Sequence, residues 1–311
     1  MALTTKHILD MNSLTSDDVR LILDTAGNMK EISRRPVKKV PTLRGKTIVS
    51  FFYEPSTRTR VSFDLAAKRL SADSLSLSAG TSSMTKGETL IDTVRNIEVM
   101  SPDVLVIRHS SAGAPHLLAR HVDVPVINAG DGMHAHPTQA LLDMMTVREK
   151  KGSLEGLRLA IIGDIARSRV ARSNIVGFTR MGARVVVAAP PTMIPRGLEA
   201  LGATVTHDVD EAVADVDVIM MLRIQKERRA AGLFSSVREY ARVYGLTSAR
   251  LKKARPDVLI MHPGPLNRGV EIAPEVADGE GSLILDQVEN GVAVRMALFY
   301  LVMGGQRDAG D

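Results

Sequence analysis

The sequence predicts an α/β fold made of two doubly wound domains, each with a central parallel sheet flanked by helices. Three observations support this prediction. Short apolar runs alternate with segments of helical period along nearly the whole chain. The runs are typical of parallel strands that helices cover on both faces. The length of 311 residues suits two domains of roughly 150 residues each.

Each element is predicted from its own stretch of sequence. Strands are expected at residues 47–52, 74–78, 104–107, 124–128, 158–162, 184–188, 203–206, 216–222 and 258–261. Helices are expected at residues 59–70, 88–100, 137–150, 169–181 and 248–254. A final helix at about 287–302 is more apolar than a solvated tail, so we expect it to pack back on the first domain.

The predicted domain boundary is the charged break Lys150-Lys151-Gly152, after which a fresh strand begins. We therefore expect one domain at residues 1–147 and a second at residues 152–303. The sequence holds no internal repeat and no low-complexity segment.

Composition excludes several classes of function. The absence of cysteine excludes disulfides, thiolate metal sites and a cysteine nucleophile. No window approaches about 18 uninterrupted apolar residues and no secretory signal is evident, so we expect a cytoplasmic protein with no membrane partner. The net charge is +5, but aromatic residues make up only 3%, too few for the usual basic and aromatic nucleic-acid groove. We expect no nucleic acid, and instead arginines that converge on a small anion.

The strongest motif lies where the first predicted strand meets a helix. The strand is followed by Tyr53-Glu54-Pro55 and then by Ser56-Thr57-Arg58-Thr59-Arg60. Free backbone N–H groups and the positive end of the helix dipole favour an anion at such a junction. Hydroxyl groups add donors, and the planar fork of Arg58 suits phosphate oxygens. A lone Ser-Thr pair would be an ordinary helix cap, but this longer run of donors predicts a phosphate site.

Three further segments place polar groups after strands. Arg108 follows the strand at 104–107, at the carboxyl end where α/β sheets bind ligands. His136-Pro137-Thr138-Gln139 opens a helix, and His262-Pro263-Gly264-Pro265-Leu266 forms a rigid turn whose carbonyl groups suit an –NH2 ligand. Taken alone, His136 would often be a core histidine and the turn an ordinary Pro-Gly loop.

Metal and nucleotide sites are not predicted. The pair His134-Ala135-His136 suggests a metal, but no neighbouring set of ligands with suitable spacing completes it. The segment after the strand at 158–162 lacks the Gly-x-Gly-x-x-Gly spacing of dinucleotide-binding folds. Gly80-Thr81-Ser82-Ser83-Met84-Thr85-Lys86 has a threonine where a P-loop needs its second glycine. We expect neither a metal nor an organic cofactor.

A second set of charged residues predicts a carboxylate site. Arg169 follows one buried strand after a short turn, and Arg223 and Gln225 follow another. Arginine binds carboxylates bidentately, and Lys86 adds a point charge. Convergence of these side chains on one cleft would suit a dicarboxylate.

The motifs, in this order, resemble the aspartate/ornithine carbamoyltransferase family over roughly residues 9–302. The resemblance implies that carbamoyl phosphate is bound by Ser56, Thr57, Arg58, Thr59, Arg108, His136, Gln139, Gly264 and Pro265. It implies catalytic roles for Arg58, Thr59, Arg108 and His136, with no covalent nucleophile. The first domain would then bind carbamoyl phosphate and the second would bind the acceptor amine.

The aspartate-using branch of the family fits better than the ornithine branch, whose acceptor turn contains a cysteine that this chain lacks. In that branch, L-aspartate is bound at the positions of Lys86, Arg169, Arg223 and Gln225. Ser82 and Lys86 match residues supplied by a neighbouring subunit, which implies a homotrimer with shared active sites. Glu54 and Arg228 match residues that orient the aspartate-binding arginines through ion pairs; ordinary surface charge is the alternative.

The implied reaction transfers the carbamoyl group of carbamoyl phosphate to the α-amino group of L-aspartate. It yields N-carbamoyl-L-aspartate and phosphate in de novo pyrimidine (UMP) biosynthesis. Two alternatives are a carbamoyltransferase for another amino acid and a scaffold subunit that keeps the fold but only binds partners. The sequence also leaves open whether the trimer stands alone, forms a hexamer, or joins regulatory chains or a dihydroorotase.

Overall fold

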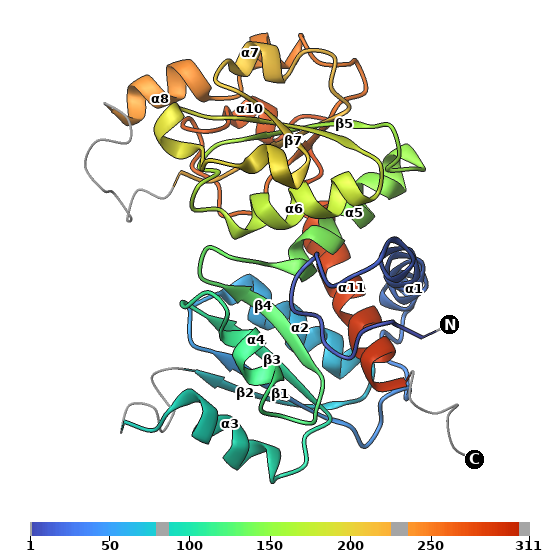
Figure 1. Ribbon diagram of the computed structural model, residues 1–311. Coiled ribbons are helices and arrows are strands. Elements are labelled where there is room, and N and C mark those ends of the chain that lie inside the picture. Colours follow the sequence, from blue (N-terminus) through green and yellow to red (C-terminus); the bar gives the residue numbers. More distant parts are fainter. Residues whose placement is uncertain (1, 79–86, 225–235, 305–311) are drawn as a thin grey trace. The chain divides into compact units, whose positions relative to one another are not determined.

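The computed structural model describes residues 2–78, 87–224 and 236–304, and the chain forms two compact units. Unit 1 consists of Met1–Met145 with Val288–Asp311, and unit 2 consists of Thr146–Gln287. Each unit has one parallel sheet flanked by helices, which confirms the predicted α/β class (Figure 1). Within the described part of the chain, no helix has both the length and the apolar character needed to cross a membrane.

The sheet of unit 1 has the strand order β2-β1-β3-β4, with every pair parallel. In chain order its elements are α1 (Ser16–Arg34), β1 (Thr47–Phe52), α2 (Thr57–Arg69), β2 (Asp73–Ser78), α3 (Leu90–Glu98), β3 (Val104–His109), α4 (Ala114–Ala119) and β4 (Val126–Asp131). Two further helices are α5 (Pro137–Lys151) and α11 (Ile284–Gly304). From Val288 onward α11 belongs to unit 1, which confirms that the C-terminal helix packs back on the first domain.

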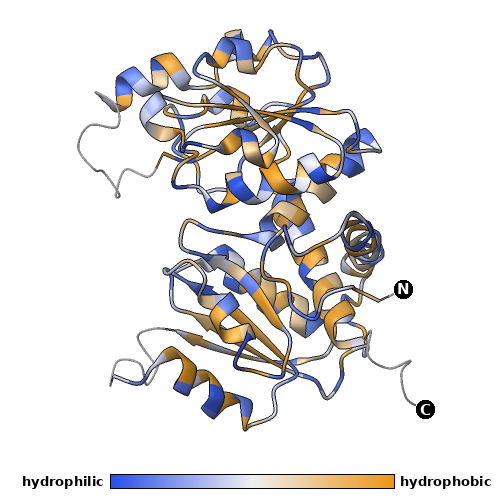
Figure 2. Cartoon of the chain, in the orientation of Figure 1, coloured by the Kyte–Doolittle hydropathy of each residue, from blue (hydrophilic) through white to orange (hydrophobic). Residues whose placement is uncertain are grey.

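The core of unit 1 has two layers because successive residues of a strand point to opposite faces. On one face, Phe51 and Ile107 pack with Val94 of α3 and Leu118 of α4. A second contact joins α2 to α11, where the rings of Phe63 and Phe299 lie 5.7 Å apart between centroids. The strands and α11 carry much of the hydrophobic colour in Figure 2. Helices on both faces explain why these strands read as continuous apolar runs.

Helix α1 was not predicted from the sequence. Its N-cap Thr15 accepts a hydrogen bond from the backbone N–H of Asp18, and the Asp18 carboxylate accepts one from the backbone N–H of Thr15. This capping box satisfies donors that a helix start leaves without helical partners. Ile22 and Leu23 are fully buried, so tertiary packing adds to the local signal.

The sheet of unit 2 has the strand order β7-β6-β5-β8-β9, again with every pair parallel. Its elements are β5 (Arg158–Ile162), α6 (Arg169–Arg180), β6 (Arg184–Ala188), η3 (Pro191–Met193), η4 (Leu198–Leu201), β7 (Ala203–Thr206), α7 (Val209–Ala212), β8 (Val218–Met221), α8 (Val237–Tyr244), α9 (Ser248–Leu251), β9 (Leu259–Met261) and α10 (Pro274–Ala277). On one face, Ile162 and Ile219 pack with Val213 and with Val276 of α10.

The strand predictions are confirmed, and β1, β5, β6 and β7 have the expected bounds. The strand expected at 124–128 instead spans Val126–Asp131, and that expected at 216–222 is shortened to Val218–Met221. The predicted helices are present with ends shifted by a few residues, as helix ends commonly are. The short helices α4, α7, α8 and α10 were missed along with α1, because four to eight residues give little periodicity.

Candidate functional site

The candidate site residues follow the strands where each sheet reverses its order. In unit 1 the chain leaves β1 for β2 on one side and later returns to β3 on the other, and Phe52 pairs with Arg108 there. In unit 2 the same reversal lies between β5 and β8, where Ile162 pairs with Met221. Ligands of open α/β sheets bind outside the carboxyl ends of strands at such switch points. The predicted site residues of each unit therefore lie where its fold would place a ligand.

The phosphate motif forms the start of α2. Ser56 is the N-cap, and its hydroxyl accepts a hydrogen bond of 3.4 Å from the backbone N–H of Thr59. Thr57 and Arg58 are exposed, while Thr59 is buried. The first turn contains no acidic residue, so nothing there repels an anion. Backbone N–H groups and hydroxyls at this helix start match the predicted phosphate site.

Arg108 is held in place at the end of β3. It is only 8% exposed, and its Nη2 donates to Oε1 of Glu54 at 2.7 Å. Its Nη1 donates to the backbone carbonyl of Ala129 at 3.1 Å. A buried, charge-assisted pair fixes the guanidinium orientation. Glu54 thus pairs with an arginine of the phosphate half, a partner that the sequence analysis did not assign to it.

His136 and Gln139 lie at the start of α5. The carbonyl of His136 accepts from the backbone N–H groups of Gln139 and Ala140, and the His136 side chain is buried. The amide nitrogen of Gln139 donates to Oδ1 of Asp143 at 2.9 Å. Because a carboxylate only accepts hydrogen bonds, this contact sets the amide orientation and turns the Gln139 oxygen toward other donors. Such an acceptor suits the –NH2 group of a carbamoyl ligand.

A buried cation that sequence reasoning missed lies in α11. Arg295 stacks over the ring of Phe63 at 4.9 Å from its centroid, and its Nη1 donates to the carbonyl of Gly291 at 2.7 Å. Burial and the nearby guanidinium of Arg108 lower the pKa of Arg295 to about 9, against the opposing effect of Asp143. The one available signal was an arginine inside an otherwise apolar helical run.

The Pro-Gly turn after β9 is braced by a buried pair that sequence reasoning also missed. Nδ1 of His262 accepts from the backbone N–H of Gly264 at 2.8 Å, and Nε2 lies 3.3 Å from Oε1 of Glu271. Both side chains are fully buried. Asn267 donates its backbone N–H to the same Glu271 oxygen and its side-chain amide to the carbonyl of Ile224. The turn is thereby tied to the residue that follows Arg223.

The arginines predicted to bind carboxylate occupy the switch point of unit 2. Arg169 begins α6 after the N-cap Ser168, whose hydroxyl accepts from the backbone N–H of Ala171 at 3.0 Å. Gly163 at the end of β5 has a φ of +136°, and a Cβ there would lie 2.7 Å from the carbonyl oxygen of Leu222. Glycine therefore permits the close approach that brings the segment before Arg223 against β5. Both arginines are partly buried.

Four residues assigned from the sequence lie outside the described residues: Ser82, Lys86, Gln225 and Arg228. Their assigned roles in substrate binding, subunit sharing and arginine orientation stay predictions.

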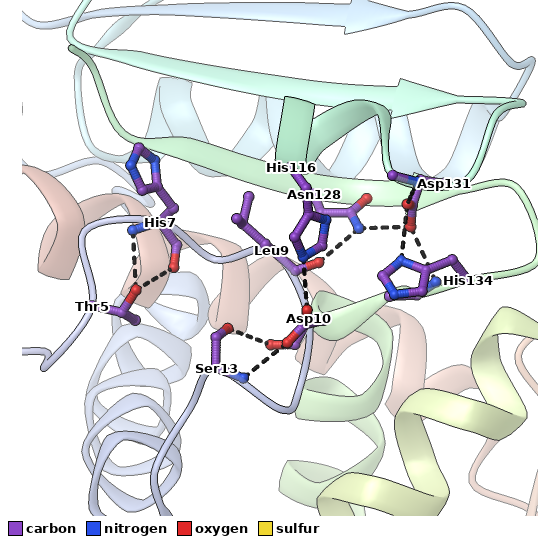
Figure 3. Close-up of polar contacts among 11 residues, drawn as sticks. Thr5, His7, Leu9, Asp10, Ser13, His116, Asn128, Asp131 and His134 are labelled. Atoms are coloured by element: carbon purple, nitrogen blue, oxygen red, sulfur yellow. Dashed lines mark hydrogen bonds and ion pairs between the residues drawn. The ribbon is translucent and has the colours of Figure 1, made fainter. Parts of the chain in front are cut away.

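The two histidines of His134-Ala135-His136 have different surroundings. The Nδ1 of His136 lies 3.5 Å from the Thr138 hydroxyl, in a buried position. His134 instead meets Asp131 and His116, as Figure 3 shows. His116 lies well upstream in α4, so local spacing gave no sign of this group.

The fold is that of a two-domain α/β protein, with the residues predicted to bind phosphate mainly in one unit and Arg169 and Arg223 in the other. The sequence matches the family described as "Aspartate/ornithine carbamoyltransferase, carbamoyl-P binding domain" over residues 6–149. It matches "Aspartate/ornithine carbamoyltransferase, Asp/Orn binding domain" over residues 155–302. The chain belongs to the aspartate/ornithine carbamoyltransferase family.

Similar proteins include members of both branches of that family. The aspartate carbamoyltransferase catalytic subunit of Desulfosudis oleivorans is 81% identical over 311 residues, covering 100% of both chains. The ornithine carbamoyltransferase of Pyrococcus furiosus is 33% identical with a TM-score of 0.88, covering 99% of this chain and 100% of that one. The Trypanosoma cruzi aspartate transcarbamoylase bound to carbamoyl phosphate and aspartate is 30% identical with a TM-score of 0.86, covering 96% and 97%. Fold similarity alone therefore does not distinguish the acceptor amines.

Proposed function

We propose that this chain transfers the carbamoyl group of carbamoyl phosphate to the α-amino group of L-aspartate. The products are N-carbamoyl-L-aspartate and phosphate, and the reaction belongs to de novo pyrimidine biosynthesis. The observation that carries the proposal is the 81% identity to an aspartate carbamoyltransferase catalytic subunit over the full length of both chains. The pair of arginines at the second switch point supports a dicarboxylate acceptor, because guanidinium groups bind carboxylates bidentately.

We assign one substrate to each of the two predicted domains. Residues 1–147 hold carbamoyl phosphate through the start of α2, Arg108, His136 and Gln139, and residues 152–303 hold aspartate. Gly264 and Pro265 accept from the carbamoyl –NH2 group, and the His262–Glu271 pair braces their turn.

The chemical step needs positioned charge rather than a covalent nucleophile. The neutral amine of aspartate attacks the carbonyl carbon, forming a C–N bond, and the C–O bond to phosphate then breaks. Thr59, Arg108 and His136 stabilise the oxyanion, while Arg58 and Arg108 offset charge on the departing phosphate. The phosphate accepts the amine proton, so no general base is assigned. Holding both substrates side by side lowers the barrier by removing their relative motion.

The assembly that fits this proposal is a cytoplasmic homotrimer. Ser82 and Lys86 of one subunit would enter the site of its neighbour, with Lys86 joining Arg169, Arg223 and Gln225 around aspartate. Three complete sites would then form only in the trimer. Regulatory chains or a dihydroorotase are further partners that this family resemblance allows.

The direct test is a colorimetric assay for ureido product, with carbamoyl phosphate and either L-aspartate or L-ornithine. We expect product with aspartate alone. Product with ornithine alone would assign the chain to the other branch of its family, in line with the similar Pyrococcus fold. No product with either amine from an assembled trimer would favour the scaffold alternative.

A further inference from the structure

Two histidines and an aspartate that the proposed reaction does not use meet at the end of β4 (Figure 3). His116 comes from α4, Asp131 is the last residue of β4, and His134 follows in the turn before α5. One nitrogen or carboxylate oxygen from each lies within 4.8 Å of those of the other two. Among the described residues, no other group of three histidines or acids meets this condition.

The contact between His134 and Asp131 already has the spacing of two metal ligands. Nδ1 of His134 lies 3.0 Å from Oδ2 of Asp131. Two ligands bound tetrahedrally at about 2.0 Å from a zinc ion are roughly 3.3 Å apart. For this pair, a metal ion in place of the shared proton requires a shift of only a few tenths of an ångström. The His116 ligand atom lies within 4.8 Å of both, so that ring would move closer on binding.

The carboxylate of Asp131 is fixed before any ion binds. Asp131 is fully buried, and its Oδ1 accepts from the side-chain amide of Asn128 at 2.8 Å and the backbone N–H of Ala135 at 3.0 Å. Its Oδ2 accepts from the backbone N–H of Gly113 at 2.7 Å, at the start of α4. A ligand held in this way loses little conformational freedom on binding.

His116 has the tautomer that a metal ligand needs. Its Nε2 lies 2.8 Å from Oδ2 of Asp10, and a carboxylate accepts, so Nε2 carries the proton and Nδ1 has the lone pair. That Nδ1 is buried and has no hydrogen-bond partner among the described residues. Metal-bound histidines commonly donate their other ring N–H to a carboxylate, as His116 does to Asp10. The imidazole rings of His116 and His134 lie edge to face with centroids 5.3 Å apart.

The donor set selects a class of ion. Two imidazoles and one carboxylate suit zinc and neighbouring divalent transition metals, whereas magnesium and calcium prefer oxygen ligands alone. The side chains of His116 and His134 are 32% and 37% exposed, which gives an ion a path to the site and leaves room for water as a fourth ligand.

We propose that His116, Asp131 and His134 bind one divalent transition-metal ion of the zinc type, with Asp10 orienting His116. The site lies outside the carbamoyl phosphate residues, but Ala135 alone separates His134 from His136. A bound ion would tie α4 to the turn that leads into α5. It acts as a structural clamp on that turn and has no part in the chemical step.

The test uses the tag-free, full-length protein stripped with a chelator and titrated calorimetrically with zinc. Cobalt serves as a spectroscopic probe, because its visible absorption reports nitrogen and oxygen ligation. We expect one ion per chain, proton release on binding because metal ligands bind deprotonated, and a melting temperature raised by zinc. His116→Gln and His134→Gln should each weaken binding at least about tenfold, and Asp10→Asn should do so by roughly 10- to 100-fold.

His121→Gln is the matched control, because His121 lies just beyond the end of α4 and outside the group of three. It should bind zinc as the wild type does. Zinc binding that is undiminished in His116→Gln and His134→Gln would overturn the proposal, as would absence of binding by the wild type. Melting curves without metal check that each variant is folded. If a glutamine variant fails to fold, Asp10→Asn with the cobalt spectrum decides in its place.

Discussion

Two arginines of the proposed phosphate site, Arg108 and Arg58, differ in burial. Arg108 is buried and oriented by Glu54 and by the carbonyl of Ala129, so its geometry exists before substrate binds. Arg58 is exposed at the start of α2. Pre-oriented donors lower the reorganisation that a transition state requires. Arg108 therefore already has the fixed orientation that its proposed role at the oxyanion requires.

Replacement of Arg58 should nearly abolish turnover. Arg58→Ala removes a charged donor to the departing phosphate, and loss of one such group typically costs about 10²- to 10³-fold in kcat. The measurement is kcat with both substrates saturating. Arg60→Ala, in the same first turn of α2, is the control and should retain most of the activity. Wild-type turnover in Arg58→Ala would refute the phosphate assignment.

Replacement of Arg223 should act chiefly on the acceptor. Arg223→Ala removes a guanidinium that binds a carboxylate, and a charged hydrogen bond contributes roughly 1.5–3 kcal/mol. The aspartate KM should rise by about 10- to 100-fold, with little change in the KM of carbamoyl phosphate. Arg255→Ala is the control, because Arg255 pairs with Asp217 ahead of β8, away from the strand's carboxyl end. An unchanged aspartate saturation curve in Arg223→Ala would exclude the role.

At the scale of elements, the close approach of Gly163, which follows β5, to Leu222, which follows β8, positions the segment that leads to Arg223. Gly163→Ala would place a Cβ 2.7 Å from the carbonyl oxygen of Leu222, at a φ of +136°. Overpacking of this kind costs roughly 1–3 kcal/mol and displaces backbone. We expect the segment before Arg223 to shift and the aspartate KM to rise several-fold, as measured in steady-state assays.

The control for Gly163→Ala is Gly156→Ala. Gly156 also has a positive φ, +75°, but a Cβ there meets nothing within 4 Å. Gly156→Ala introduces backbone strain at a positive φ but no steric clash with a neighbouring residue. The free energy of unfolding should therefore fall while the aspartate KM stays unchanged. Equal kinetic effects in the two variants would mean that strain, rather than contact with Leu222, is responsible.

The capping box of α1 should make stability depend on pH. Burial raises the pKa of Asp18, but hydrogen bonds from Thr4 and Thr15 more than offset this and hold it below the usual value. A depressed carboxyl pKa stabilises the fold above the unfolded value of about 3.9, and this contribution is lost as pH falls through the folded value. Asp18→Asn should therefore lower stability by about 1–2 kcal/mol at pH 7.

The measurement is the urea midpoint of wild type and Asp18→Asn at pH 7 and at progressively lower pH. The gap between the two should narrow as pH falls below about 4. Asp17→Asn, an exposed neighbour 89% accessible at its side chain, should stay within about 0.5 kcal/mol of wild type. A gap that is constant with pH would show that Asp18 acts through packing rather than charge.

At the scale of the molecule, the features that could be predicted from the sequence are those that depend on a local residue pattern. Buried parallel strands are apolar in sequence, and residues near or just after their ends, such as Arg108 and Arg223, lie at the carboxyl ends by the geometry of the fold. Contacts between residues far apart in the chain could not be predicted from the sequence. The pairing of Glu54 with Arg108 joins two strand ends that only the sheet order brings together. Likewise, α1 is stabilised by tertiary burial, which could not be predicted from its largely polar sequence.

Because α11 packs in unit 1, its side chains contact the helix that carries the motif at residues 56–60. Phe299 of α11 meets Phe63 of α2, the helix whose first turn carries that motif. Phe299 is fully buried, and truncation of a buried phenylalanine typically costs about 3–5 kcal/mol. Phe299→Ala should thus destabilise unit 1 selectively, although the substitution lies near the end of the chain.

Hydrogen exchange read by mass spectrometry tests this at peptide resolution. In Phe299→Ala, peptides from β1, α2 and β3 should lose protection against hydrogen exchange. Peptides from the sheet of unit 2 should keep their protection, because different regions of one protein open with separate free energies. Tyr300→Ala is the neighbouring control, with 39% of the residue exposed, and should change protection little. Equal loss in both units would mean that they unfold as one cooperative body. Loss confined to unit 1 would mean that α11 contributes to the stability of unit 1 and not to that of unit 2.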